Sequence, residues 1–142
     1  NQPTYVAYSR IDKGLCGIPQ AYRKILSEVA REENWSPIVT LSKKYIDDNY
    51  YKEELCLQDV ANELKISSAY LSRLLRQELG ASFIDYLTQH RIKKAIQLMN
   101  DPFIKIYEVA EKVGYNSQHY FSTAFKKVIG ISPAEYRKGG MN

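Results

Sequence analysis

From residue 36 onward, apolar residues recur at the three- and four-residue spacing that is typical of amphipathic helices. Ser36 followed by Pro37 favours a helix start, because serine can cap free N–H groups and proline fits the first turn. The apolar face of that helix is predicted to consist of Ile38, Leu41, Tyr45 and Ile46. Further helices are predicted at about 57–64, from 68 to a stop at Gly80, at about 82–99, twice between 106 and 130, and from 132.

The pattern of residues 57–80 occurs a second time in residues 106–130. The apolar positions match at an offset of 49 before the turn (60 to 109) and of 50 after it (70 to 120), so the second copy has one extra turn residue. Each copy is predicted to be a short helix, a tight turn and a second helix that ends at a glycine. A duplicated helix-turn-helix indicates a protein that reads two adjacent places on DNA.

Polar residues and glycines mark the ends of the helices in the second half of the chain. Gly114 is expected to supply the turn of the second copy, and Ser132 with Glu135 forms a capping box for the last short helix. The final pair Gly139-Gly140 is interpreted as a frayed tail. The second helix of the second copy is expected to be lined by Tyr120, Phe121, Ala124, Phe125 and Val128.

The composition limits the classes of protein that fit. With 142 residues the chain can bury one modest core or two small ones, and it lacks the run of about eighteen apolar residues that spans a membrane. A net charge of +4 permits nucleic-acid binding without diagnosing it. Cys16 and Cys56 lie 40 positions apart, which favours neither a zinc site nor a disulfide scaffold. We expect a buried, free Cys56 and a reducing, cytoplasmic setting.

The first 35 residues differ from the rest of the chain. Residues 4–9 alternate enough to suggest a strand, and residues 21–33 suggest a helix. One strand and one helix cannot form an independent core. We therefore expect residues 1–35 to be a linker or a short α/β remnant of an upstream regulatory domain, and residues 36–142 to be a DNA-binding domain.

The outward positions of the second helix in each copy are the candidate DNA contacts, because that helix projects into the major groove. In the first copy these positions are Ser68, Ala69, Ser72, Arg73 and Arg76. Arg73 is the strong candidate for reading a base, since its guanidinium can donate two hydrogen bonds to guanine. Arg76, about one turn further on, is better placed for a phosphate.

The second copy offers a different set of side chains. Its outward positions are Ser117, Gln118, His119, Ser122, Thr123, Lys126 and Lys127. Gln118 can bond adenine through two atoms, and His119 can donate to a base or to a phosphate. The two lysines are expected to contact the backbone and to add salt-dependent affinity without sequence information.

Each of these assignments has a plainer alternative. Two helices at this spacing also occur in helical proteins that never contact DNA. Arg76 and the pair Lys126-Lys127 fit an ordinary solvated face, and His119 fits a surface histidine. His90 and Arg91 are interpreted as packing at a helix junction rather than as base contacts.

From about Leu41 to Arg137 the chain resembles the DNA-binding domain of the AraC/XylS family of bacterial transcription regulators. The most specific segment is Lys105-Ile106-Tyr107-Glu108-Val109-Ala110-Glu111-Lys112-Val113-Gly114-Tyr115. It is followed, at the family's spacing, by Tyr120-Phe121-Ser122, Phe125-Lys126-Lys127, Gly130, Ser132-Pro133 and Tyr136-Arg137. The sequence departs from the family's pattern at Thr123, where many members have arginine, and Ala69 is too small to hydrogen-bond a base.

The resemblance implies an all-α fold with two helix-turn-helix subdomains, at about 57–80 and 106–130, joined by a long linker helix at about 82–99. Each subdomain would be a homeodomain-like three-helix unit. The implied function is sequence-specific binding of double-stranded DNA, with two recognition helices in successive major grooves of a non-palindromic site. RNA polymerase is an expected partner if the protein is an activator, and a sensor or receiver domain is expected upstream; no membrane contact is expected of this fragment.

No catalytic constellation is visible in the sequence, which lacks a paired serine and histidine, a metal-ligand cluster and a phosphate loop. We therefore expect neither an enzyme nor a cofactor. The alternative is a binding module fused to an enzyme, since some DNA-repair methyltransferases resemble this domain in part of their chain. A reactive cysteine motif would support that alternative, and neither Cys16 nor Cys56 lies in one.

Overall fold

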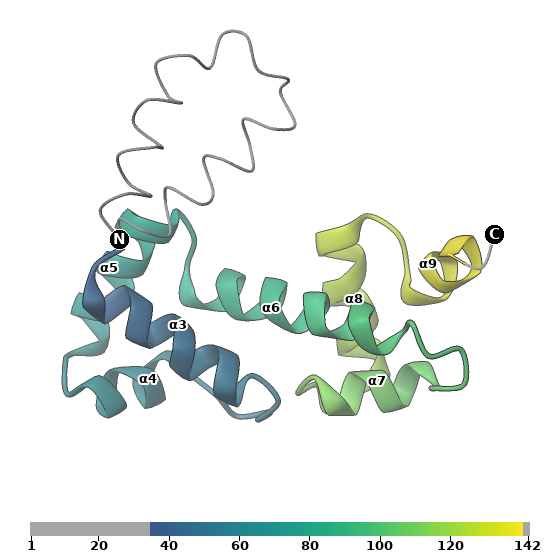
Figure 1. The fold of residues 1–142 in the computed structure, drawn as a ribbon, viewed down its shortest axis with the longest axis horizontal. Coiled ribbons are helices and arrows are strands. Elements are labelled where there is room, and N and C mark those ends of the chain that lie inside the picture. Colours follow the sequence, from purple (N-terminus) through teal and green to yellow (C-terminus); the bar gives the residue numbers. More distant parts are fainter. Residues whose placement is uncertain (1–34, 141–142) are drawn as a thin grey trace, which may run out of the picture. The chain divides into compact units, whose positions relative to one another are not determined.

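A computed structural model describes residues 35–140, and residues 38–142 form one compact unit. The described part contains helices and no strand (Figure 1). The helices are α3 (Pro37–Asn49), α4 (Leu57–Leu64), α5 (Ser68–Leu79), α6 (Phe83–Leu98), α7 (Ile106–Lys112), α8 (Gln118–Ile129) and α9 (Pro133–Gly140). The strand and helix predicted within residues 1–35 lie outside the described residues.

The first helix-turn-helix consists of α4 and α5, and α4 has the bounds that the pattern predicts. The N–H of Cys56 donates to the Asp59 carboxylate at 3.0 Å, which fixes the start of α4. Lys65 ends α4 in the left-handed region with φ +58°. The Ser67 hydroxyl then accepts a hydrogen bond from the N–H of Tyr70 and caps α5.

The second helix-turn-helix consists of α7 and α8 and uses the same kind of cap. The Ser117 hydroxyl accepts a hydrogen bond from the N–H of Tyr120, fifty positions after the matching pair in α5. Gly114 has φ +102° in the turn, as its predicted role requires. Both second helices end at a glycine in the left-handed region, Gly80 and Gly130.

Equivalent side chains anchor the second helix of each copy. Leu71 and Leu75 of α5 are fully buried, and so are Phe121 and Phe125 of α8. The core around α8 also contains buried residues of α6 and α7 and of the positions that directly follow these two helices, namely Ile92, Ala95, Met99, Val109, Ala110 and Val113. The long helix α6 therefore contributes to the core of the second copy as well as connecting the two.

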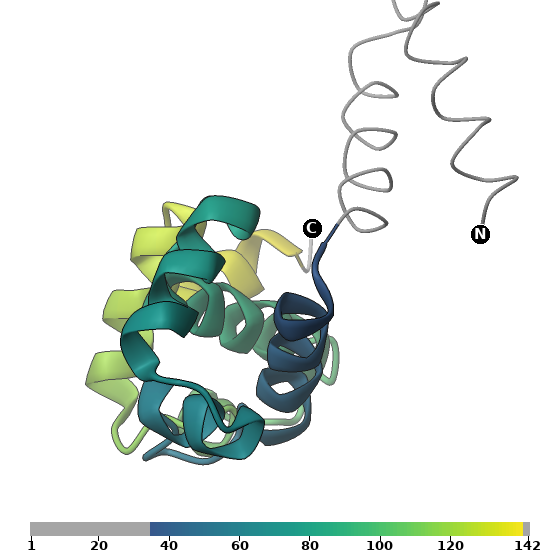
Figure 2. The same cartoon turned by 90° about the vertical axis from the view of Figure 1, so that its left-hand side faces the viewer.

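Figures 1 and 2 together show how α6 arranges the two copies. The pair α4 and α5 lies near the N-terminal end of α6, and the pair α7 and α8 lies near its C-terminal end (Figure 1). In Figure 2, α5 and α8 lie on one side of α6, whereas α3 lies on the other side. The second helices of both copies thus present their outer faces on the same side.

The last helix is held by both its start and its end. Ser132 and Glu135 exchange the two hydrogen bonds of the predicted capping box, at 3.1 and 3.2 Å. Hydrogen bonding of the Glu135 carboxyl by the backbone N–H and by the hydroxyl of Ser132 lowers the pKa of this carboxyl below its ordinary value. Arg137, part of the segment that resembles the family, donates to the carbonyl oxygen of Ile104 at 2.6 Å and so ties α9 to the loop before α7.

Three predictions about burial are wrong. The buried face of α3 is Val39, Ser42 and Ile46, whereas Leu41 is half exposed, so the stripe is rotated from the predicted one. Cys56 is exposed although apolar residues flank it, because it is the capping residue just before α4 at the surface.

The third error concerns α8, where Tyr120 and Val128 are exposed although a buried lining was predicted. The α8 residues Phe121 and Phe125 already fill the core, and no described element covers the positions beside them. In addition, Gly139 and Gly140 belong to α9 and are not a frayed tail. Within residues 35–140, none of the helices is both long and apolar enough to cross a membrane.

Replacing Phe121 with alanine should lower the free energy of unfolding by about 3–5 kcal/mol, because the fully buried ring leaves a cavity. Phe103→Ala is the matched control, since that ring is 88% exposed and its loss should change stability by less than about 0.5 kcal/mol. Urea unfolding followed by circular dichroism measures both. Equal losses in the two variants would contradict the assigned core.

Candidate nucleic-acid interface

The candidate residues of the first copy lie on the outer face of α5, opposite its buried leucines. Ala69, Arg73 and Arg76 are exposed, and Ser68 and Ser72 are partly exposed. The Arg73 guanidinium carbon lies 5.9 Å from the centre of the Tyr70 ring. This cation–π contact restricts the flexible Arg73 side chain beside the start of the helix.

The candidate residues of the second copy occupy the equivalent face of α8. Gln118, His119, Thr123, Lys126 and Lys127 are exposed, and Ser117 and Ser122 are partly exposed. The Thr123 hydroxyl donates to the carbonyl oxygen of His119 at 3.0 Å, so its proton is already used within the helix. Thr123 therefore offers its methyl group and its oxygen lone pairs to a partner, whereas Arg73 offers several donors.

The two sets of candidates carry positive charge at the same end of each helix. Arg76 lies in the last turn of α5, and Lys126 and Lys127 lie in the last turn of α8. Cations there are favoured by the partial negative charge of a helix C-terminus. The structure thus brings the two helices that carry the predicted residues to one side of α6 (Figure 2), and these residues are exposed or partly exposed on them.

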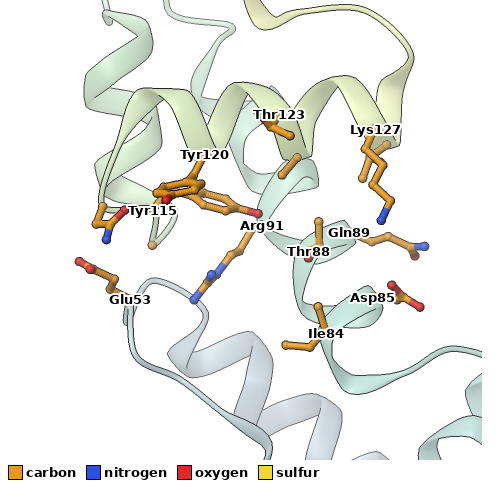
Figure 3. A pocket seen from close by; sticks show the side chains of 14 residues that line it. Glu53, Ile84, Asp85, Thr88, Gln89, Arg91, Tyr115, Tyr120, Thr123 and Lys127 are labelled. Atoms are coloured by element: carbon orange, nitrogen blue, oxygen red, sulfur yellow. The ribbon is translucent and has the colours of Figure 1, made fainter.

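A cleft of about 700 Å³ lies between α6 and α8, next to the second set of candidates (Figure 3). Thr123 and Lys127 line it from α8, and Ile84, Thr88 and Gln89 line it from α6. Ile84 and Tyr120 are each 63% exposed at this cleft. Tyr120 was predicted to line the core, and Ile84 was not predicted as a site residue, although it is an apolar residue outside the buried stripe of its helix.

His90 and Arg91 support the packing of helices, as the sequence analysis expected. His90 Nδ1 lies 3.2 Å from Asp47 Oδ1 of α3, and the Tyr86 hydroxyl donates to the same oxygen at 3.2 Å. Burial lowers the pKa of His90, and nearby Lys94 lowers it further, although Asp47 opposes both. A neutral imidazole also fits this site better than a charged one, which carries an N–H on both ring nitrogens. Among the described residues the buried Nε2 has no hydrogen-bond acceptor for such an N–H.

Arg91 is 8% exposed and donates to two backbone carbonyl oxygens of the turn after α3. Burial lowers the pKa of its guanidinium and raises the pKa of Tyr115, whose ring lies beside it. In the part of the chain that the structure describes, no group of three or more His, Cys, Asp or Glu side chains is placed to hold a metal ion.

Comparison with known proteins identifies the class to which this fold belongs. A family model described as "Helix-turn-helix domain" matches residues 60–139. The C-terminal domain of AraT, a response regulator from Geobacillus stearothermophilus, is 48% identical, with a TM-score of 0.73 over 75% of this chain and 88% of that one. The C-terminal domain of the two-component response regulator yesN from Fusobacterium nucleatum is 37% identical, with a TM-score of 0.68 over 72% and 99%.

Two further relatives come from well-known bacteria. A DNA-binding transcriptional dual regulator from Escherichia coli is 32% identical, with a TM-score of 0.65 over 72% of this chain and 91% of that one. The uncharacterized HTH-type transcriptional regulator YfiF of Bacillus subtilis is 39% identical over 102 residues, which are 72% of this chain and 32% of YfiF. The chain spans about a third of the length of the curated relatives it matches.

The chain belongs to the helix-turn-helix family of AraC type. The resemblance and the fold class that the sequence analysis inferred are thereby confirmed. The comparisons do not assign a role to any single residue of α5 or α8.

The free energy of unfolding should fall as the pH is lowered below 6.5, the ordinary pKa of histidine. Because the folded state lowers the pKa of His90, the unfolded state takes up the proton at a higher pH than the folded state does. The free energy of unfolding therefore decreases as the pH falls from 6.5 to the lower pKa of His90 in the folded chain. His90→Gln should flatten that slope in urea unfolding between pH 5 and 7.5. Gln97→Ala, at an exposed position of the same helix, is the control, because it removes no titratable group and should keep the parent slope. An unchanged slope in His90→Gln would contradict the assignment.

Proposed function

We propose that this chain binds double-stranded DNA sequence-specifically, with α5 and α8 as recognition helices in successive major grooves of one non-palindromic site. The observation that carries the proposal is the placement of two equivalent helices, α5 and α8, on one side of α6 (Figure 2), each with a row of exposed polar residues. The similar protein from Escherichia coli is named as DNA-binding, which supports the same chemistry here.

The dimensions of the linker helix suit two adjacent major grooves. The 16 residues of α6 extend about 24 Å at about 1.5 Å per residue. Because the two helix-turn-helix pairs lie near opposite ends of α6 (Figure 1), we propose that α5 and α8 are separated by about one turn of DNA, roughly 34 Å. One chain would then do the work that a symmetric dimer does on a palindromic operator.

The exposed side chains support a division between residues that read bases and residues that bind phosphates. We assign base reading to Arg73 of α5 and to Gln118 and His119 of α8. Arg76, Lys126 and Lys127 are assigned to phosphates because they lie in the last helical turns, further from the helix start.

The remaining candidates have smaller assigned roles. Ala69 and Thr123 offer only apolar contact or an acceptor, and the candidate serines of both copies are only partly exposed. We therefore propose that the first unit discriminates bases more strongly and that the second contributes more to docking.

The whole protein is proposed to be a cytoplasmic transcription regulator. The similar response regulators from Geobacillus and Fusobacterium support a receiver domain in the longer protein, and RNA polymerase is a proposed partner if the protein activates transcription. The relatives reported above do not support the alternative of a module fused to a DNA-repair methyltransferase. A helical protein-interaction module would be favoured if the chain lacked salt-dependent affinity for DNA.

Selection of bound sequences from a random duplex pool tests the proposal and supplies a cognate site. A bipartite, non-palindromic consensus with halves about ten base pairs apart is the expected result. Failure to enrich any sequence, despite a folded chain, would contradict sequence-specific binding.

Arg73→Ala should weaken binding to the cognate site by about 1–3 kcal/mol and relax the preference at one base pair. The loss arises because the guanidinium donors that read guanine are removed. Titrations of cognate and random duplexes by fluorescence anisotropy measure it. Equal losses on both duplexes would show that Arg73 does not read a base.

Lys126→Ala should instead weaken all duplexes to a similar extent and reduce the slope of log affinity against log salt by about 1. Lys44→Ala is the control, because Lys44 is an exposed lysine of α3, on the other side of α6 from α5 (Figure 2). A parent-like salt slope for Lys126→Ala would exclude the phosphate contact.

A further inference from the structure

The two copies differ at the residue that makes the left-handed turn. Lys65 occupies it in the first copy with φ +58°, so a side chain is compatible with such a turn. Gly114 occupies it in the second copy with φ +102°. A Cβ atom at Gly114 would lie 2.7 Å from the carbonyl oxygen of Tyr50 and 3.0 Å from the Arg91 guanidinium. Glycine is therefore required at 114 because the backbone of the turn between α3 and α4 approaches it directly.

Arg91 of α6 holds that approaching backbone in place. Its Nε donates to the carbonyl oxygen of Tyr50 at 2.9 Å, and its Nη2 donates to that of Lys52 at 2.8 Å. Its guanidinium carbon lies 5.3 Å from the centre of the Tyr115 ring. Figure 3 shows Arg91 extending from α6 toward the turn that carries Glu53, with Tyr115 beside it.

The Tyr50 side chain makes a second connection between the copies. It follows α3, which precedes the first helix-turn-helix, yet its ring packs against the core cluster to which α6, α7 and α8 contribute. The turn after α3 is thus joined to α6 through its carbonyl oxygens and to the core cluster of α6, α7 and α8 through a ring.

A buried arginine adds little to the free energy of unfolding, because its charge loses its hydration on burial. An apolar residue of similar volume would stabilise the fold to a similar extent. What distinguishes arginine from an apolar residue is that its hydrogen bonds have fixed directions. The planar guanidinium donates to two fixed carbonyl groups, and a shift of the turn along α6 would break both hydrogen bonds. Arg91 therefore constrains how the first unit sits against the second more strongly than apolar contacts would.

We propose that Arg91 and Gly114 form a positioning junction, which sets the separation and angle of α5 and α8 and thereby the number of base pairs between the two half-sites. The statement about half-sites rests on the proposed function, whereas the geometric statement does not. The junction consists of Arg91, Gly114, Tyr115 and the carbonyl groups of Tyr50 and Lys52.

The geometric part is tested without DNA. Spin labels are placed at Gln77 and Lys127, which are exposed and occupy equivalent positions of the two copies, after Cys16→Ser and Cys56→Ser. Pulsed dipolar spectroscopy on the 142-residue chain should give a narrow distance distribution for the parent and a broad or shifted one for Arg91→Met. A parent-like distribution in a folded Arg91→Met variant would overturn the junction.

The DNA part uses duplexes in which the spacer between the selected half-sites is one base pair shorter or longer. Each added base pair rotates and displaces one half-site relative to the other, so a rigid chain should prefer its own spacer by about tenfold or more. Arg91→Met should reduce that preference to about threefold or less while retaining its base preferences within each half-site. An undiminished spacer preference would overturn the link from Arg91 to half-site spacing.

Two further variants make the result specific. Lys93→Met removes the same charge from an exposed position of α6, so it should keep both the narrow distribution and the spacer preference. Arg91→Lys keeps the charge but lacks the planar fork, so it should give intermediate results and serves as the test variant if Arg91→Met does not fold.

A parent chain that selects no DNA sequence would overturn the proposed function and the spacing claim. The distance distributions would still decide whether Arg91 fixes the two units. The two proposals can therefore fail separately.

Discussion

Two buried side chains on the second helix of each unit determine which residues face outward. Leu71 and Leu75 anchor α5, and Phe121 and Phe125 anchor α8, one turn apart in each case. Rotation of either helix about its axis would expose an anchor, at about 1.5–3 kcal/mol for each large apolar side chain. Packing of the buried side chains therefore determines which face of each helix is exposed. Because the anchors occupy equivalent positions in α5 and α8, the exposed residues of the two helices also occupy equivalent positions.

The copies share their scaffold but differ on their outer faces and in their turns. The outer face of α5 carries a guanidinium at 73, where α8 carries a threonine hydroxyl that already donates within the helix. The turn of the second copy has the extra residue, and its glycine accepts the close approach of the first unit. We interpret the second copy as having two roles, namely contact with the turn that precedes the first copy and binding of DNA.

Much of the fold could be predicted because helix periodicity, caps and left-handed glycines are local signals. The bounds of α4, the stops at Gly80 and Gly130 and the box of Ser132 with Glu135 depend on neighbours within a few residues. Burial was predicted less well, since it depends on which neighbouring helix covers the apolar stripe of a given helix. Tyr120 has an apolar position in the pattern, yet it lies beside a cleft, and Cys56 lies at a helix start on the surface.

The sequence by itself determined the duplication, the helix-turn-helix class and the identity of the outward residues, because each follows from spacing within one short segment. Only the tertiary structure decided that α5 and α8 present their faces on one side of α6 (Figure 2). It also decided that Arg91 donates to carbonyl groups about forty positions earlier in the chain. Such contacts depend on the packing of whole helices against one another, and no local pattern of residues encodes the distance or angle between them.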